Sequence, residues 1–119
     1  MLLAAAGHNV LLLDRDAFPS DTLSTHAIAR GGVVQLKRWG LLQAVLDTGA
    51  PAIHNVEFHG QGLDVTRTIK QRNGIDMIVA PRRHVLDMLL VNAAISAGAQ
   101  LMTGVTGNGV RRADDGRIT

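Results

Sequence analysis

The first part of the chain places short apolar stretches between polar ones. Residues 2–6 are apolar and are followed by Gly7, a residue type that adopts positive φ where a helix stops, so we expect the last turns of a helix here. Residues 10–13 form a continuous apolar run that stops abruptly at Asp14. A run of this kind predicts a strand buried on both faces, as in a parallel sheet.

The pattern then changes to helical spacing. Ser24 or Thr25 can cap a helix that continues to about Trp39, because residues 28, 32, 36 and 39 fall on one helical face. Gly40 ends this helix in the prediction, and residues 41–46 make a second short helix before the Gly-Ala-Pro sequence at 49–51.

The middle of the chain favours strands. Residues 53–60 alternate, imperfectly, between apolar and polar side chains, and a glycine turn joins them to a second predicted strand at residues 63–69. Residues 77–79 suggest a short third strand. This part of the sequence therefore predicts an antiparallel piece.

The last part returns to helix and strand. Arg82 or Arg83 opens a strongly apolar helix of about 14 residues, and Ala-Gly-Ala at 97–99 ends it. Residues 100–103 read as a strand. Asn-Gly at 108–109 and Asp-Gly at 115–116 mark hairpin turns. The whole order predicts an α/β chain with an inserted antiparallel β piece, with residues 1–119 belonging to one domain.

Composition narrows the classes of function. The chain has no cysteine, which excludes a disulfide framework, a thiol nucleophile and a thiolate metal site. Its formal charge is +2, and the basic residues are scattered without aromatic residues between them, so no nucleic-acid partner is expected. No apolar stretch has the length of a membrane span. We expect a cytoplasmic protein.

Asp14 carries the most informative chemistry. In dinucleotide folds, an acid at the carboxyl end of the second strand accepts hydrogen bonds from the adenosine ribose hydroxyls. The full motif has a glycine-rich turn about 20 residues earlier, which supports the pyrophosphate at a helix N-terminus. Only 13 residues precede Asp14. We therefore expect an internal fragment that lacks the glycine-rich motif.

Three segments in order carry a more specific resemblance. They are Ala-Gly-His-Asn-Val-Leu-Leu-Leu-Asp-Arg-Asp at 6–16, Phe-Pro-Ser-Asp-Thr-Leu-Ser-Thr-His at 18–26, and Val-Ala-Pro-Arg-Arg-His-Val-Leu-Asp at 79–87 followed by Ala-Gly-Ala at 97–99. Together they resemble FAD-dependent oxidoreductases of the group-A flavoprotein monooxygenase and geranylgeranyl reductase superfamily. The resemblance implies a partial Rossmann-like FAD-binding domain.

The resemblance also implies roles for matching residues. Asp14 would bind the adenosine ribose of FAD, and Arg15 would lie against the adenine or its ribose. Ser24 and Thr25 match the positions at which, in members of this family, the protein chain passes across the FAD pyrophosphate. Arg83 matches the arginine that reaches the flavin-side phosphate or ribityl chain, and the neighbouring Arg82 could substitute for it. Many relatives use an arginine near Ser24, and this sequence has none between positions 15 and 30.

The implied activity is that of a monooxygenase or a flavin reductase acting on an organic substrate, with NAD(P)H as a possible electron donor and the remainder of the flavoprotein chain as a partner. No catalytic residue is assigned, because the flavin carries the redox chemistry. No metal site is expected either. His54 and His59 are five positions apart on a predicted strand and would point to opposite faces.

Other interpretations stay open. Asp14 would serve NAD equally well, which would make the chain part of a dehydrogenase, and a truncated non-catalytic chain is a third reading. Arg15 lies between two aspartates and could form exposed ion pairs, which contribute little. Ser24 and Thr25 could be ordinary helix caps. Arg82 and Arg83 oppose the helix dipole, which favours a bound anion or a nearby carboxylate.

Overall fold

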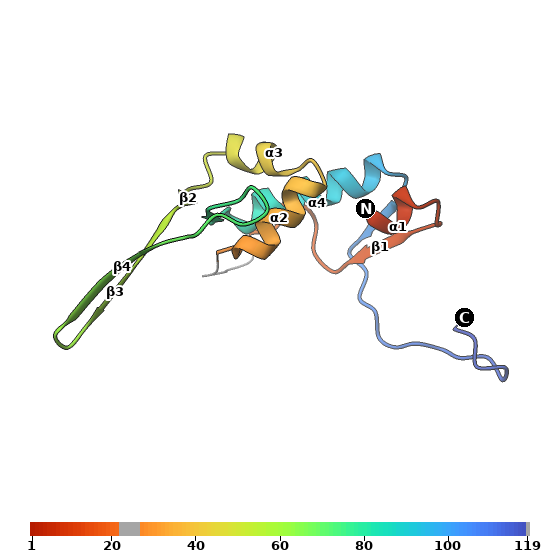
Figure 1. The fold of residues 1–119 in the computed structure, drawn as a ribbon. Helices are drawn as coiled ribbons and strands as arrows, with labels where there is room; N and C mark the ends of the chain where they lie inside the picture. The colour runs from red at the N-terminus through yellow and green to blue at the C-terminus, as the bar shows by residue number, and fades with distance from the viewer. Residues whose placement is uncertain (22–26, 119) are drawn as a thin grey trace. The chain divides into compact units, whose positions relative to one another are not determined.

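The computed structural model describes residues 1–21 and 27–118 of the chain (Figure 1). The chain divides into two compact units. The terminal unit consists of Met1–Phe18 and Val91–Thr119, and the central unit consists of Pro19–Leu90. Each unit is described by itself.

The terminal unit contains a parallel pair of strands. The short helix α1 (Leu2–Ala5) precedes strand β1 (Leu11–Asp14), which pairs in parallel with β6 (Gln100–Thr103) from Leu11↔Gln100 to Asp14↔Thr103. Gly7 has φ +87°, which confirms the predicted helix end. The predicted strands at both positions are confirmed as well.

Only one face of β1 is covered. Leu12 and Asp14 are half-buried, whereas Leu11 and Leu13 are 55% and 46% exposed. Successive side chains of a strand point to opposite faces, so the two exposed leucines share one face. The buried cluster of this unit consists of small residues: Ala4, Ala94 and Ala99. The prediction that β1 is buried on both faces is therefore wrong for this chain.

The central unit is built around two helices, α2 (Arg30–Arg38) and α3 (Leu42–Asp47). Gly40 has φ +72° and separates them as predicted, while the Leu41 N–H donates to the Leu36 carbonyl at 2.9 Å. Their apolar faces bury a continuous core. Its buried members are Val33, Val34, Leu36, Val45, Ile75, Val79 and Leu86.

Helix α2 begins later than the sequence suggested. Its first residue is Arg30, and the preceding Ala29 is extended, with φ −61° and ψ 157° and no side-chain cap. Ile28 pairs with Val79: the Ile28 N–H donates to the Val79 carbonyl at 2.7 Å, and the Val79 N–H donates back at 3.3 Å. This pairing needs extended backbone, so a helix running from Ser24 or Thr25 is wrong. Both of those residues lie outside the described part of the chain.

Two antiparallel pairs confirm the inserted β piece. Strand β2 (Ala52–Ile53) pairs with β5 (Ile78–Val79), and β3 (Asn55–Gly60) pairs with β4 (Leu63–Thr68). The second pair forms an extended two-stranded ribbon (Figure 1). Its residues are almost all exposed, so the ribbon depends on its hydrogen-bond ladder more than on burial.

Helix α4 (Arg83–Ser96) has the predicted start and length, and the boundary between the two units falls inside it. Gly98, with φ +98°, lies between this helix and β6. The turn at residues 115–116 is confirmed by a bridge between Arg112 and Ile118. Residues 108–109 form no turn, so that hairpin prediction is wrong. The observed elements confirm the α/β class with its antiparallel insertion.

In residues 1–21 and 27–118, no helix has both the length and the apolar character needed to cross a membrane.

Candidate functional site

Asp14 ends β1 at the edge where the parallel pair finishes. Its Oδ1 accepts a hydrogen bond from the Asp16 N–H at 2.8 Å, and its main-chain carbonyl accepts one from the Val105 N–H at 3.0 Å. The first contact turns the chain sharply after the strand. The second ties the segment after β6 to the end of β1. The ends of the two paired strands are thereby held together beside the Asp14 carboxylate.

This edge borders an open hollow of about 470 Å³ in the terminal unit. That volume lies within the range of about 300–1,000 Å³ that is usual for small-molecule sites. Asp14 and Arg15 both line it. The full lining is Leu13, Asp14, Arg15, Asp16, Val105, Thr106 and Gly107.

Arg15 forms the exposed ion pair that its neighbours suggested. Its Nε lies 3.5 Å from Asp16 Oδ1, and its side chain is 76% exposed. A long, exposed pair of this kind contributes little stability, because water and salt screen it. The guanidinium can therefore turn toward a ligand in the hollow at small cost.

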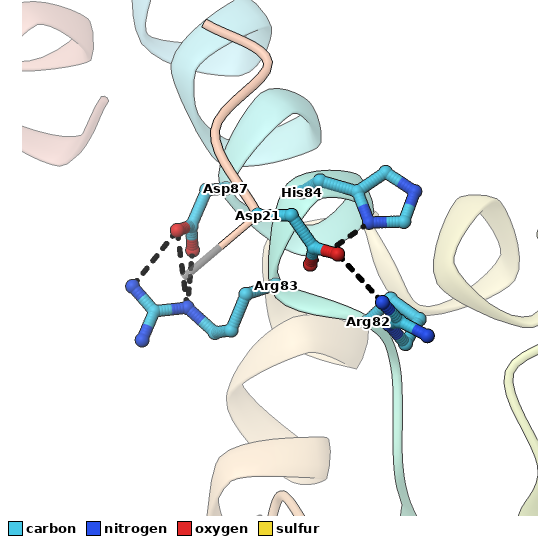
Figure 2. Close-up of polar contacts among 5 residues, drawn as sticks. All are labelled: Asp21, Arg82, Arg83, His84 and Asp87. Atoms are coloured by element: carbon cyan, nitrogen blue, oxygen red, sulfur yellow. Dashed lines mark hydrogen bonds and ion pairs between the residues drawn. The ribbon is translucent and has the colours of Figure 1, made fainter. Parts of the chain in front are cut away.

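Arg83 is held by a carboxylate on its own helix. Its Nε donates to both Asp87 oxygens at 3.0 Å, and its Nη2 donates to Asp87 Oδ2 at 2.8 Å (Figure 2). This hydrogen bond is the main reason that the pKa of Arg83 is raised above its ordinary value. The Nη1 group is not part of the pair, so a guanidinium has N–H donors left for a phosphate. Asp87 thus fixes the direction of Arg83 while leaving it able to bind an anion.

Arg82 and His84 share a different carboxylate. Asp21 Oδ2 accepts from Arg82 Nη2 at 2.6 Å, and Asp21 Oδ1 lies 3.2 Å from His84 Nδ1. Figure 2 shows Asp21 facing both side chains, while Arg83 and Asp87 form their separate pair. The hydrogen bond from Arg82, followed by that from His84, lowers the pKa of Asp21. Arginines at a helix N-terminus oppose the helix dipole, which favours a carboxylate nearby. Both Arg82 and Arg83 have such a carboxylate, Asp21 and Asp87 respectively.

Sequence reasoning missed Asp21 and Asp87 as partners of these arginines. Asp87 had a local signal, since a residue four positions after Arg83 on a helix lies beside it. Asp21 had none, because it is 61 positions away from Arg82. Only the fold brings that pair together.

The described histidines of the β piece lie at its surface. His54 falls between β2 and β3 and contacts the Asp76 carbonyl at 3.2 Å. His59 belongs to β3 and contacts Glu57 and Asp64 at 3.4 and 2.9 Å. The two therefore do not share one strand, and the expectation of a single strand is wrong.

The structure thus places the predicted residues in three ways. Asp14 and Arg15 line one hollow of the terminal unit. Arg83 lies in the central unit beside Asp87. Ser24 and Thr25 are outside the described residues. A carboxylate beside an open hollow can accept two hydroxyl hydrogen bonds, and the two arginines can neutralise phosphates.

No protein-family model matches this chain, and no curated protein matches it significantly by sequence. Solved structures do match its fold. CmlS, a flavin-dependent halogenase, aligns with a TM-score of 0.82 at 24% identity over 98% of this chain and 22% of its own. PqsL, a probable FAD-dependent monooxygenase from Pseudomonas aeruginosa, aligns at 0.79 with 16% identity over 98% of this chain and 32% of its own.

A flavoprotein/dehydrogenase from Cytophaga hutchinsonii aligns with a TM-score of 0.73 at 17% identity, covering 98% of this chain and 33% of its own. The chain therefore spans about a third of the length of these proteins, or less. The resemblance that the sequence motifs indicated is confirmed at the level of the fold. This chain has the α/β fold of one part of the FAD-dependent monooxygenases and halogenases.

Proposed function

We propose that this chain is the part of an FAD-dependent oxidoreductase that binds the adenosine end of FAD. The observation that carries the proposal is the position of Asp14: a carboxylate at the carboxyl end of a parallel strand, beside an open hollow, on a fold shared with FAD-dependent enzymes. Ligands of α/β sheets bind outside the carboxyl ends of the strands. The terminal unit then represents part of a Rossmann-like sheet.

The residues fit the chemistry of this ligand. Asp14 Oδ1 already accepts from Asp16, and the carboxylate retains acceptor positions for the ribose hydroxyls. Arg15 can stack against the adenine, since its pair with Asp16 is long and exposed. Arg83 supplies charge to a phosphate or the ribityl chain, oriented by Asp87. Ser24 and Thr25 remain predicted pyrophosphate contacts.

FAD itself supplies the redox chemistry when bound, so the protein binds, orients and shields it. The proposed enzyme is a monooxygenase or flavin reductase acting in the cytoplasm on an organic substrate, with NAD(P)H as electron donor. One PqsL structure is a complex with 2-aminobenzoylacetate, a small organic molecule. That finding concerns PqsL, and it supports an organic substrate for the enzyme proposed here.

Titration of the apo-enzyme that contains this chain with FAD tests the proposal. Asp14→Ala removes a charged acceptor, and hydrogen bonds to charged groups contribute about 1.5–3 kcal/mol, so FAD affinity should fall about ten- to a hundredfold. Arg83→Ala should also weaken FAD binding. His54→Ala is the matched control, because its side chain is a surface group of the β piece. Equal FAD affinity of the Asp14 variant and the parent, measured by flavin fluorescence, would contradict the assignment.

The two alternatives give different results in the same titration. A nicotinamide-binding dehydrogenase would bind NAD in preference to FAD and would lose NAD affinity in the Asp14 variant. A non-catalytic chain would bind neither dinucleotide in a saturable way. The fold neighbours favour FAD over both, since they are flavin-dependent enzymes.

A further inference from the structure

A second hollow, of about 230 Å³, lies in the central unit beside helix α2, and neither Asp14, Arg15 nor Arg83 lines it. It is small and mainly polar. Three of its lining residues are arginines and two carry side-chain amides. The full lining is Arg30, Gly31, Val34, Gln35, Arg38, Arg72 and Asn73.

Helix geometry explains one wall. Arg30 and Arg38 are eight positions apart, which places them on the same side of α2 about 12 Å apart along its axis. Long guanidinium side chains can close that distance over a small ligand. Between them, at Gly31, an added Cβ would meet nothing within 4 Å. The missing side chain leaves the hollow open.

A rigid turn forms the other wall. Arg72 and Ile75 exchange two main-chain hydrogen bonds, with the Arg72 N–H donating at 2.8 Å and the Ile75 N–H at 3.1 Å. Asn73 and Gly74 between them have φ of +54° and +71°. Positive φ at both central residues, with the Asn-Gly sequence, is typical of a type I′ hairpin turn. Arg72 and Asn73 are thereby held in place beside α2.

The charge of this hollow is uncompensated within the described structure. Arg15, Arg82 and Arg83 each pair with a carboxylate. Among residues 1–21 and 27–118, Arg30, Arg38 and Arg72 form no such pair, and Arg30 instead donates to the main-chain carbonyl of Lys70. Three like charges around one small hollow repel one another unless an anion lies between them.

We propose that this hollow binds the phosphate group of a small phosphate-bearing molecule. Guanidinium groups donate in pairs to phosphate oxygens, and a dianion matches several arginines better than a single carboxylate does. Gln35 and Asn73 supply further N–H donors. The volume admits a phosphate group, and the rest of the molecule extends outside. The shared chemistry is the phosphate, whether it is inorganic phosphate or a phosphate monoester.

Equilibrium dialysis of the chain with labelled inorganic phosphate tests the proposal, with AMP, adenosine and acetate as competitors. Phosphate should bind saturably, AMP should displace it, and adenosine and acetate should not. If AMP binds more tightly than phosphate, the ligand is a phosphate monoester. If the two bind equally, the site recognises the phosphate group alone. Binding without saturation, or displacement by acetate, would overturn the proposal.

Charge variants locate the site. Arg38→Ala and Arg72→Ala should each weaken phosphate binding by about tenfold or more. Arg67→Ala removes the same charge from β4, outside the hollow, and should leave binding unchanged. Equal losses in all three variants would mean that only net charge matters and would refute a defined site.

A steric variant keeps the charge constant. Gly31→Leu places a side chain in the open space and should abolish phosphate binding. The folded chain should melt at the same or a higher temperature, because leucine favours a helix more than glycine does. Full phosphate binding by this variant would place the ligand elsewhere. Asp14→Ala should leave phosphate binding intact, so failure of the proposed FAD site and failure of this site give separate results.

Discussion

The two units bury their apolar residues in different ways. The central unit has a core of valines, leucines and isoleucines, in which Val33, Val45 and Val79 are fully buried. The terminal unit buries three alanines and Val91, and it leaves one face of β1 exposed. Hydrophobic stabilisation scales with the apolar area removed from water, and an alanine removes little. Most of the stability of this chain therefore comes from the central unit, while Asp14 depends on the β1–β6 ladder.

The largest expected effect comes from a matched pair of leucine substitutions, one in each unit, which compares how much each unit contributes to stability. Leu36→Ala, at a side chain that is 4% exposed in the central core, should lower the free energy of unfolding by about 2–5 kcal/mol. Leu13→Ala, at a side chain that is 46% exposed, should cost less than about 1 kcal/mol. Urea unfolding measures both. Equal losses would show that the exposed face of β1 is covered in solution.

A pair of adjacent glycines tests how tightly the central unit packs. Gly31→Ala should stabilise the chain by about 0.5–1 kcal/mol, because alanine favours a helix and the site has room. Gly32→Ala should be less stable than Gly31→Ala, since its Cβ would lie 2.6 Å from Ile28 Cγ2. Ile28 is β-branched and its backbone is paired with Val79, so it cannot easily move. Thermal melts measure the stability of both variants. A Gly32→Ala variant that is more stable than Gly31→Ala would contradict this packing.

The smallest expected effect concerns Asp21, near the start of the central unit. Because its pKa is lowered in the folded chain, its contacts stabilise the fold above the ordinary carboxyl pKa, and this contribution is lost as pH falls through the lowered value. A carbon-detected NMR titration should show the lowered pKa in the parent. In Arg82→Ala it should rise toward the ordinary range, and in His84→Ala it should rise less.

An Asp21 titration that is identical in the parent and in Arg82→Ala would mean that the 2.6 Å contact does not form in solution.

Elements with strong local signals were predictable from the sequence. Residues 100–103 come shortly after Gly98, which ends the preceding helix, and the strand has those bounds. Helix α4 begins at Arg83, one of its two predicted starts. The position of Asp14 at the end of β1 was predictable because a polar residue ends an apolar run. In each case, the information lies within a few positions along the chain.

Features that depend on distant residues were missed. Ile28 has helical spacing with Leu36, yet it pairs with Val79, which is 51 positions later. Ser24 and Thr25 have the chemistry of helix caps, but no local rule reveals that the backbone at Ile28 is extended. The arginine-lined hollow needs Arg72 to come beside α2, and only the folded chain shows this.

The parallel register of β1 and β6 has a consequence for how this chain can vary in length. Side chains alternate along a strand, so one inserted or deleted residue in β1 would turn Asp14 to the opposite face and replace it with an apolar neighbour. The ribbon of β3 and β4 ends in an exposed turn at Gly62, where an added residue disturbs little. Among natural variants, insertions should therefore collect at the ribbon tip, and the distance from Gly7 to Asp14 should stay constant.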